Sequence, residues 1–253
     1  GVVTALNSDG FSLGDEGDIN SDSGTFVAWG WKESATSGFD IVAYTGDGNA
    51  GNTEAHSLSA VPHCMIIKQR NGTGDWIVYH HKNTSAPETD HLTFKEAATS
   101  DALNKLNDVA PTSSIFTLGD GGDTNGSSDT YVNYLFSEKQ GFSKFGEYPG
   151  NGSANGDFVF LGFRPAMVIV KGNNTESWSM YDDQREGYNV DNDVLYPNGS
   201  NAEGTSDDID LLSNGFKIRR ATGLLNDDAV GYVYCAWAKA PFVNSNGVPC
   251  NAR

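Results

Sequence analysis

The feature that most constrains how this chain can fold is an internal repeat with a period of about 103 residues. Three motifs recur in the same order. Phe39–Gly48 returns as Phe142–Gly152, Pro62–Lys68 as Pro165–Lys171, and the pair Trp76 and Tyr79 as Trp178 and Tyr181; the first two are spaced by 103 residues and the third by 102. Because order, spacing and residue type are kept together, the sequence predicts two copies of one folding unit.

A further motif occurs three times and adds a partial copy at the start of the chain. Phe11–Gly14 matches Phe116–Gly119 and, more loosely, Phe216–Ile218, and an aromatic segment follows each about fifteen residues on. The predicted organisation is therefore a partial unit at 1–38, repeat one at 39–140, repeat two at 141–242 and a tail at 243–253. A halved unit cannot easily bury its core. Two explanations stay open: the chain is the C-terminal part of a longer array, or residues 1–37 pack onto a neighbouring unit.

Short apolar or alternating runs separated by Gly, Asn, Asp and Ser predict strands joined by tight turns. The expected strands are Thr25–Trp29, Phe39–Tyr44, Cys64–Lys68, Trp76–Tyr79, His91–Phe94, Ser114–Leu118, Thr130–Phe136, Lys144–Tyr148, Asp157–Phe160, Met167–Lys171, Trp178–Tyr181, Ile209–Leu212, Phe216–Ile218 and Tyr232–Ala238. One helical turn is plausible within Lys95–Lys105. The fold class is all-β, with two tandem antiparallel β-sandwich units of a jelly-roll-like kind, about 103 residues each, plus the N-terminal partial unit.

Composition narrows the classes of partner. The 33 Asp and Glu residues against 16 Lys and Arg residues give a formal net charge of −17. Nucleic-acid binding and docking on anionic membranes both need clusters of basic residues, so neither partner is expected. No apolar stretch approaches the length of a membrane span, so no membrane insertion is expected, and no signal peptide is visible. Of the three cysteines, Cys64 and Cys235 are predicted to lie in the core and Cys250 to be accessible.

Residues that often carry catalysis are present, but they form no recognisable constellation. The neighbouring His80 and His81 would point to opposite faces of a strand, so we expect them to be surface residues at a strand end. The acidic pairs Asp207–Asp208 and Asp227–Asp228 are expected to lie in solvated turns. Trp76 and Trp178 recur at one place in both repeats, which favours a core role. The sequence therefore predicts no enzyme activity and no catalytic residues.

One polar cluster has the spacing of oxygen ligands typical of calcium loops. Asp18, Asn20 and Asp22 alternate along the chain and Gly24 follows, with a counterpart at 120–129. The terminal Glu of a helix–loop–helix calcium site is absent. Two interpretations stay open: a calcium site formed by Asp18, Asn20 and Asp22, or a hairpin loop without a ligand. Calcium is the one cofactor that the sequence suggests.

The repeated motifs resemble tandem β domains of tail-fibre-like structural proteins in marine tailed phages, of the cyanophage and pelagiphage type. The resemblance is carried by Phe-x-x-x-x-Tyr-x-Gly-x-Gly, by Pro-x-x-[Met/Val]-Ile-[Ile/Val]-Lys and by Trp-x-x-Tyr, and it covers nearly the whole chain. It implies an extracellular virion protein that forms a homo-oligomer, expected to be a trimer, and contacts other virion proteins. It carries no site residues over to this chain.

Three functions follow as alternatives. The first is a fibre component that binds a glycan or envelope receptor on the host surface. The second is a capsid decoration, head fibre or spacer that binds nothing. The third is an enzyme that degrades envelope polysaccharide. The host, the receptor and the position in the virion are not encoded in any recognisable motif.

Overall fold

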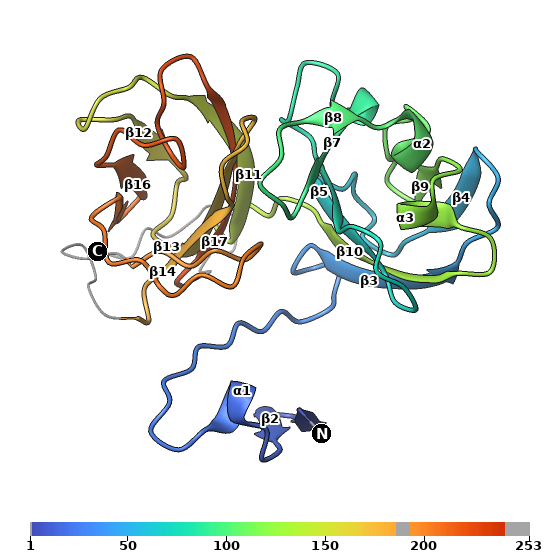
Figure 1. The fold of residues 1–253 in the computed structure, drawn as a ribbon, viewed down its shortest axis with the longest axis horizontal. Coiled ribbons are helices and arrows are strands. Elements are labelled where there is room, and N and C mark those ends of the chain that lie inside the picture. Colours follow the sequence, from blue (N-terminus) through green and yellow to red (C-terminus); the bar gives the residue numbers. More distant parts are fainter. Residues whose placement is uncertain (1, 186–192, 241–253) are drawn as a thin grey trace. The chain divides into compact units, whose positions relative to one another are not determined.

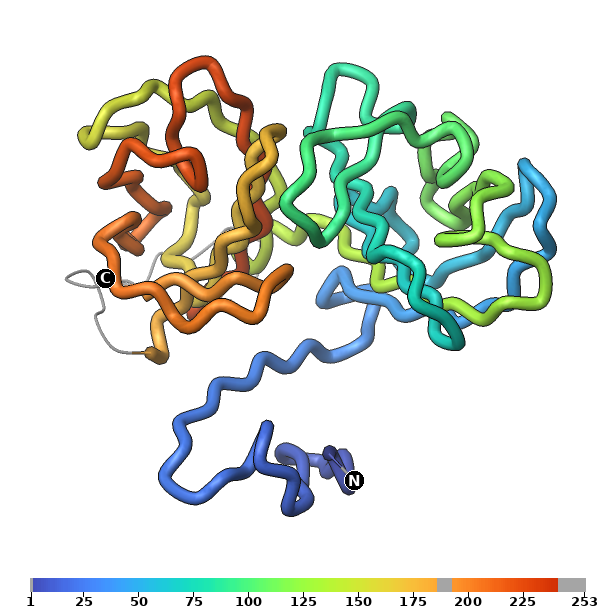
Figure 2. Tube along the Cα trace, viewed as in Figure 1, coloured from blue at the N-terminus to red at the C-terminus, as the bar shows by residue number. Residues whose placement is uncertain are grey.

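The computed structural model describes residues 2–185 and 193–240, and the chain divides into two parts, residues 1–31 and 32–253. The predicted tail at 243–253, with Cys250, lies outside the described residues. Every pair of neighbouring strands is antiparallel, which confirms the all-β prediction. Figures 1 and 2 show the course of the chain. Among the described residues no helix is long and apolar enough to cross a membrane.

Residues 39–140, repeat one, form a six-stranded sheet and a two-stranded sheet with a core between them. The large sheet has the order β3-β10-β5-β6-β7-β8 and the small one pairs β4 with β9. The strands are β3 (Phe39–Thr45), β4 (Asn52–Ala55), β5 (Cys64–Gln69), β6 (Ile77–His80), β7 (Asp90–Thr93), β8 (Ser100–Asp101), β9 (Ile115–Leu118) and β10 (Thr130–Phe136), with short helices η1 (Pro87–Thr89), α2 (Leu103–Leu106) and α3 (Gly122–Asn125). Tyr44, Ile67, Phe116 and Tyr131 are among the buried core residues.

Residues 141–242, repeat two, follow the same plan. A four-stranded sheet has the order β11-β17-β13-β14 and a three-stranded sheet the order β12-β16-β15. The strands are β11 (Ser143–Pro149), β12 (Phe158–Phe160), β13 (Pro165–Gly172), β14 (Ser179–Asp182), β15 (Ile209–Leu212), β16 (Gly215–Ile218) and β17 (Gly231–Ala238). The core between the sheets includes Tyr148, Val168, Phe216 and Tyr232.

Strand register shows which positions of the two repeats are equivalent. Tyr44 lies opposite Tyr131 on β10, and Tyr148 lies opposite Tyr232 on β17. The same registers place Phe39 opposite Phe136 and Ser143 opposite Trp237. The first strand is therefore offset by 104 residues, and the alignment of Phe39 with Phe142 is wrong by one, because the Tyr ring in the core fixes the register rather than the first Phe.

The two repeats contact each other through the outer faces of their large sheets. The Nε1 of Trp178 donates to the carbonyl of Thr93 at 2.7 Å, and its ring lies 4.6 Å from that of Phe94. Phe136 and Trp237 pack with ring centroids 5.6 Å apart. A strand with apolar residues on both faces needs cover on both sides. The contact explains why seven of the eight residues of β17 are buried.

The N-terminal segment, residues 2–31, contains one hairpin and one helical turn. The hairpin pairs β1 (Val3–Asn7) with β2 (Gly10–Leu13), and α1 spans Gly17–Asn20. The strand predicted at Thr25–Trp29 is wrong: these residues have no regular secondary structure and belong to none of the sheets formed by the described residues. Their counterpart β10 lies between β3 and β5, and the segment has no equivalent of either strand.

Two other predictions in the first repeat need correction. The helical turn expected within Lys95–Lys105 is limited to α2, and β8 occupies part of the preceding stretch. Trp178 is buried as expected, whereas Trp76 is 40% exposed. Trp178 lies in the contact between the repeats, whereas Trp76 meets the ring of Phe94 edge-on and has the Nζ of Lys68 5.9 Å from the centroid of its own ring. Cys64 and Cys235 are buried free thiols, as predicted.

Candidate functional site: a groove beside β12

Two phenyl rings are exposed to solvent on β12, the edge strand of the small sheet of repeat two. Phe158 and Phe160 are 43% and 57% exposed, while Val159 between them packs into the core. Side chains alternate between the faces of a strand, so both phenyl rings lie on the outer face. Large exposed aromatic rings on neighbouring positions are unusual and often mark a surface that binds something.

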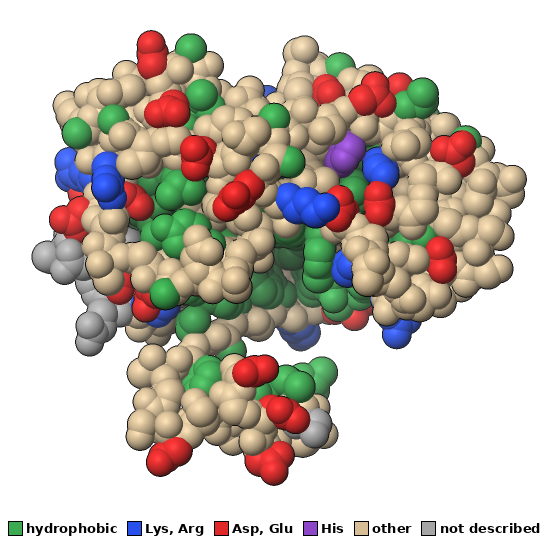
Figure 3. Space-filling view, viewed as in Figure 1, with side chains coloured by type: hydrophobic (Ala, Val, Ile, Leu, Met, Phe, Trp, Pro, Cys, Tyr) green, Lys and Arg blue, Asp and Glu red, His purple; other side chains and the backbone are tan. Residues whose placement is uncertain are grey.

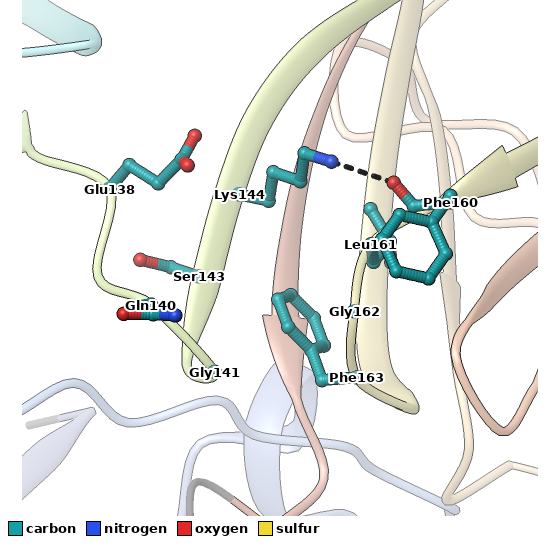
Figure 4. A pocket seen from close by; sticks show the side chains of 9 residues that line it. All are labelled: Glu138, Gln140, Gly141, Ser143, Lys144, Phe160, Leu161, Gly162 and Phe163. Atoms are coloured by element: carbon teal, nitrogen blue, oxygen red, sulfur yellow. Dashed lines mark hydrogen bonds between the residues drawn. The ribbon is translucent and has the colours of Figure 1, made fainter. Parts of the chain in front are cut away.

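The ring of Phe160 borders a groove of about 360 Å³ between β11 and the end of β12. Figure 4 shows one wall formed by Glu138, Gln140 and Ser143, and the other by Phe160, Leu161 and Phe163. Leu161 and Phe163 are buried in the core of repeat two, so the apolar wall is anchored. A second hollow of about 400 Å³, which contains Asp157, Phe158 and Glu147, shares Lys144 and Phe160 with the first.

Lys144 connects the two walls. It is carried by β11, and its Nζ donates to the carbonyl of Phe160 at 2.7 Å (Figure 4). The same Nζ lies 5.5 Å from the centroid of the Phe160 ring, within the range of a cation–π contact. One hydrogen bond uses one of three ammonium protons, so the group can still donate to a ligand. Lys144 therefore orients Phe160 and offers a charged donor at the junction of the hollows.

The equivalent place in repeat one has none of these features. Register with the following strand equates Phe158 with Thr53 and Phe160 with Ala55. It also equates Lys144 with Asp40, a buried carboxylate that accepts a hydrogen bond from the backbone N–H of Ser57. Repeat one folds with small residues there, so the fold does not require the aromatic rings. The exposed aromatic pair and Lys144 are therefore features particular to repeat two.

The charge around the groove is mixed and mostly acidic. Glu138, Glu147 and Asp157 line the two hollows, and Lys144 is the basic residue among the lining residues. Figure 3 shows Asp and Glu side chains spread over the visible face with fewer Lys and Arg. Anionic ligands are disfavoured by such a field, so a neutral ligand suits the groove best.

Flat apolar rings flanked by carboxylates, an amide and an ammonium group suit a molecule with one apolar face and many hydroxyls. Carboxylate oxygens accept hydrogen bonds from hydroxyls, and Lys144 and Gln140 can donate to them. Phe160 offers apolar contact area at a low cost in side-chain entropy. A sugar ring has these properties, with C–H groups on one face and hydroxyls at its rim. The arrangement is thus suited to binding a sugar ring.

The calcium candidates lie together in the N-terminal segment. Asp18 and Asn20 belong to α1, and Asp22 follows in the next turn; all three are exposed. The Nδ2 of Asn20 donates to the carbonyl of Gly14 at 2.8 Å. Calcium binding at Asp18, Asn20 and Asp22 stays a prediction, and the turn also has a structural role that its counterparts make clear.

Asn125 and Asn226, the counterparts of Asn20, are fully buried and each fastens a loop from the first strand of its repeat. The Oδ1 of Asn125 accepts from the N–H of Asp47, and its Nδ2 donates to the carbonyls of Asn49 and Gly119, all within 3.0 Å. Asn226 does the same for the loop after β11. Buried amides that satisfy several backbone groups at once hold a structure firmly.

The two tyrosines that follow these amides complete the same device. The hydroxyl of Tyr131 accepts from the N–H of Gly126, and that of Tyr232 accepts from Asp227 and donates to the carbonyl of Gly223, both at 2.9 Å. Sequence reasoning missed this device, although the Asn that precedes each aromatic segment was a usable signal.

The histidines predicted at the surface lie in the contact between the repeats, so that prediction is wrong. His80 is buried, its Nε2 donates to the carbonyl of Tyr234, and its Nδ1 accepts from the N–H of Lys82. His81 is half-buried and its Nε2 donates to the carbonyl of Phe145. Burial lowers the pKa of His80 to about 3. Both rings are neutral structural groups because repeat two covers the end of β6.

One of the acidic residues predicted in solvated turns is also buried. Asp208 accepts a hydrogen bond from the hydroxyl of Tyr181 at 3.1 Å and pairs with Arg220 at 3.3 Å. Burial raises the pKa of the Asp208 carboxyl. The prediction fails because Asp208 directly precedes β15 and turns inward beneath the small sheet. Asp227 and Asp228 are exposed, as expected.

The chain belongs to a family defined by a domain of unknown function, DUF7483, whose model matches residues 1–241. That match includes the N-terminal segment together with both repeats. Neither a curated protein nor a solved structure matches the chain.

Proposed function

We propose that this member of the DUF7483 family is a structural protein of a phage fibre that binds a neutral glycan on the host surface. The observation that carries the binding role is the exposed pair Phe158 and Phe160 beside Lys144, which line two adjoining hollows and have no aromatic or basic counterpart in repeat one. The fibre role rests on the resemblance of the repeated motifs to phage tail-fibre-like proteins. In such a protein the chain works outside the cell, as a homo-oligomer held among other virion proteins.

Rigidity supports the proposal. One wall of the groove is the segment between β12 and β13, whose residues Leu161 and Phe163 are buried in the core, so little ordering is needed when a ligand binds. Binding sites that exist before the ligand arrives lose less entropy on association. A weak single site of this kind reaches useful strength when an oligomer presents several copies to one surface.

A labelled-protein adsorption assay on candidate bacterial strains, together with a glycan array, tests this proposal. We expect saturable, strain-specific binding with affinity for uncharged sugars. The double variant Phe158→Thr/Phe160→Ala places the residues of repeat one in repeat two and should weaken binding roughly 30-fold, since it removes two aromatic contacts of about 1 kcal/mol each. Leu103→Ala, which removes a similarly exposed apolar side chain of repeat one, is the control and should bind as the parent does.

The same assay decides between the alternatives. A folded protein that binds no strain and no glycan would favour a spacer or capsid decoration, a role that the packed contact between the repeats also suits. Release of soluble sugar from envelope polysaccharide would favour an enzyme. Running the assay with and without calcium tests the prediction for Asp18, Asn20 and Asp22, because only a bound ion would make adsorption depend on chelation.

A further inference from the structure

The N-terminal segment has the local structure of the second half of a repeat. The N–H of Asn20 donates to the carbonyl of Glu16 at 2.9 Å, as Asn125 does to Gly121 and Asn226 to Thr222. The Nδ2 of Asn20 and of Asn125 donate to Gly14 and Gly119 at the same distance, 2.8 Å. The hairpin β1–β2 matches β15–β16 in the register of the three residue pairs next to the turn and in the Ser-Asp/Asn-Gly-Phe sequence at the turn.

A strained backbone position recurs in all three copies. Ser23, Ser128 and Ala229 have φ of 62°, 67° and 61°, in the left-handed region that residues other than glycine rarely adopt. In each copy this residue comes three places after the conserved Asn and three before an aromatic residue. Three non-glycine residues in one unusual conformation at one place indicate the same loop, so the segment is built like the halves that do have partners.

The side chains that form the core in the repeats lie open in the segment. Phe11 is 47% exposed, whereas its counterparts Phe116 and Phe216 are fully buried. Phe26 is 51% exposed, whereas Tyr131 and Tyr232 are fully buried. The segment thus has the residues of a core without the half that covers them.

The repeats show what covers this surface. Tyr44 of the first half stacks on Tyr131 at 5.2 Å and meets Phe116 edge-on at 5.9 Å. Tyr148 makes the same two contacts in repeat two, at 5.2 and 6.1 Å. Each tyrosine hydroxyl also donates to a carbonyl just before the conserved Asn, at Thr124 and Leu225.

The loop that follows this tyrosine needs glycine. A Cβ on Gly46 would lie 2.4 Å from the carbonyl oxygen of Gly126, and one on Gly150 would lie 2.0 Å from that of Asp227. The N–H groups of the next residues reach the Oδ1 of the buried Asn. In the segment, the Oδ1 of Asn20 accepts no hydrogen bond from any described residue. The partner must therefore present a Tyr-x-Gly strand and loop.

We propose that residues 2–31 are the second half of a third repeat, completed by a first-half segment of the same repeat on the N-terminal side of Val2 in the same polypeptide. In both complete repeats the first half directly precedes the second half in the chain. We therefore infer that the covering segment also comes from the preceding part of the same polypeptide. The segment supplies the strand equivalent to β3 and β11, whose Tyr covers Phe11 and Phe26 and whose loop binds Asn20. This inference does not depend on the glycan groove.

Hydrogen exchange on the chain of residues 1–253 is the first test. Amides of β2, α1 and 25–29 should exchange at nearly intrinsic rates, while their counterparts in β9, β10, β16 and β17 are protected. Slow exchange of residues 2–31 in the monomer would overturn the proposal. Protection that rises with protein concentration as a discrete dimer forms at low salt would also overturn it, because a second copy would then be the occupant.

The second test adds the missing half. A copy of residues 142–207 fused before Val2 should slow exchange in β2, α1 and 25–29 by about 100-fold or more. The control carries Tyr148→Ala and Gly150→Val in the added copy only, and it should leave exchange fast. Asn20→Ala should reduce protection in the extended chain and change nothing in the chain of residues 1–253. A fusion that keeps the original repeats protected but leaves the segment unprotected would contradict the proposal.

Discussion

The two repeats share a core and differ at their outer strands. Both use a Tyr stacked on a Tyr and a buried Asn that holds the loop after the first strand. At the outer strand, repeat one has Thr53 and Ala55, and repeat two has Phe158 and Phe160. The shared Tyr pair and buried Asn are therefore required by the fold. The candidate binding residues Phe158 and Phe160 are not required by it, because repeat one folds without them.

The largest effect should come from the shared core. We expect Asn125→Ala and Asn226→Ala each to lower the free energy of unfolding of its repeat by about 3 kcal/mol, since several buried backbone groups lose their partners. Urea denaturation measures this. Asn125→Asp and Asn226→Asp keep Oδ1 but lose the donor, and each should fall between the parent and the alanine variant. A marked difference between the repeats would break the comparison, because it would mean that only one of them depends on its Asn.

The next effect concerns a position where the repeats differ in charge. His80 of repeat one corresponds to Asp182 of repeat two, which is paired with Arg185. The pKa of His80 is about 3 in the folded protein and the unfolded chain has the ordinary value near 6.5, so the unfolded chain binds a proton between these pH values. Stability should therefore fall as pH drops below 6.5, by about 2 kcal/mol between pH 6.5 and 5.

His80→Gln can still donate to Tyr234 but does not titrate, and it is the variant that isolates this effect. Denaturation across that pH range should show a slope about one proton shallower than that of the parent. Burial also lowers the pKa of His63, His81 and His91, so some slope should remain. An unchanged slope in the variant would show that His80 is not the group that titrates.

The smallest effect is expected from grafting the aromatic pair into repeat one. Thr53→Phe/Ala55→Phe should change the free energy of unfolding by less than about 0.5 kcal/mol, because both positions are exposed. The graft should add no measurable glycan site, since Asp40 takes the place of Lys144. Calorimetric titration of a graft made on Phe158→Thr/Phe160→Ala measures this directly. Binding equal to that of the parent would show that the rings alone make the site.

Much of the fold could be predicted because its strands are short apolar runs between turn residues. The predicted strands of both repeats form, whereas the partial copy indicated by the third motif at Phe11–Gly14 stays a prediction. Thr25–Trp29 failed because the pattern of a strand does not reveal whether neighbours are present to pair with it. The predicted period of 103 residues was wrong by one at the first strand. The reason is that the segment from Phe142 to Tyr148 is one residue longer than the segment from Phe39 to Tyr44.

The candidate site was largely out of reach of the sequence. Phe158 and Phe160 resemble any alternating strand, and which face meets solvent depends on the sheet that Val159 packs into. His80 and Asp208 were assigned to the surface because their burial depends on partners far along the chain, Tyr234 and Tyr181. The polarity of one sequence segment does not predict contacts with residues elsewhere in the chain.

The open side of β2 has a practical consequence for handling the protein. Its backbone amides and carbonyls pair with β1 on one side only, next to the exposed ring of Phe11. An unpaired strand of this kind is a template for other chains. The net charge of −17 makes two chains repel each other and so opposes their association. This repulsion extends over about 30 Å at 0.01 M salt but over only about 8 Å at 0.15 M salt. The rate of aggregation of this chain should therefore rise with salt concentration.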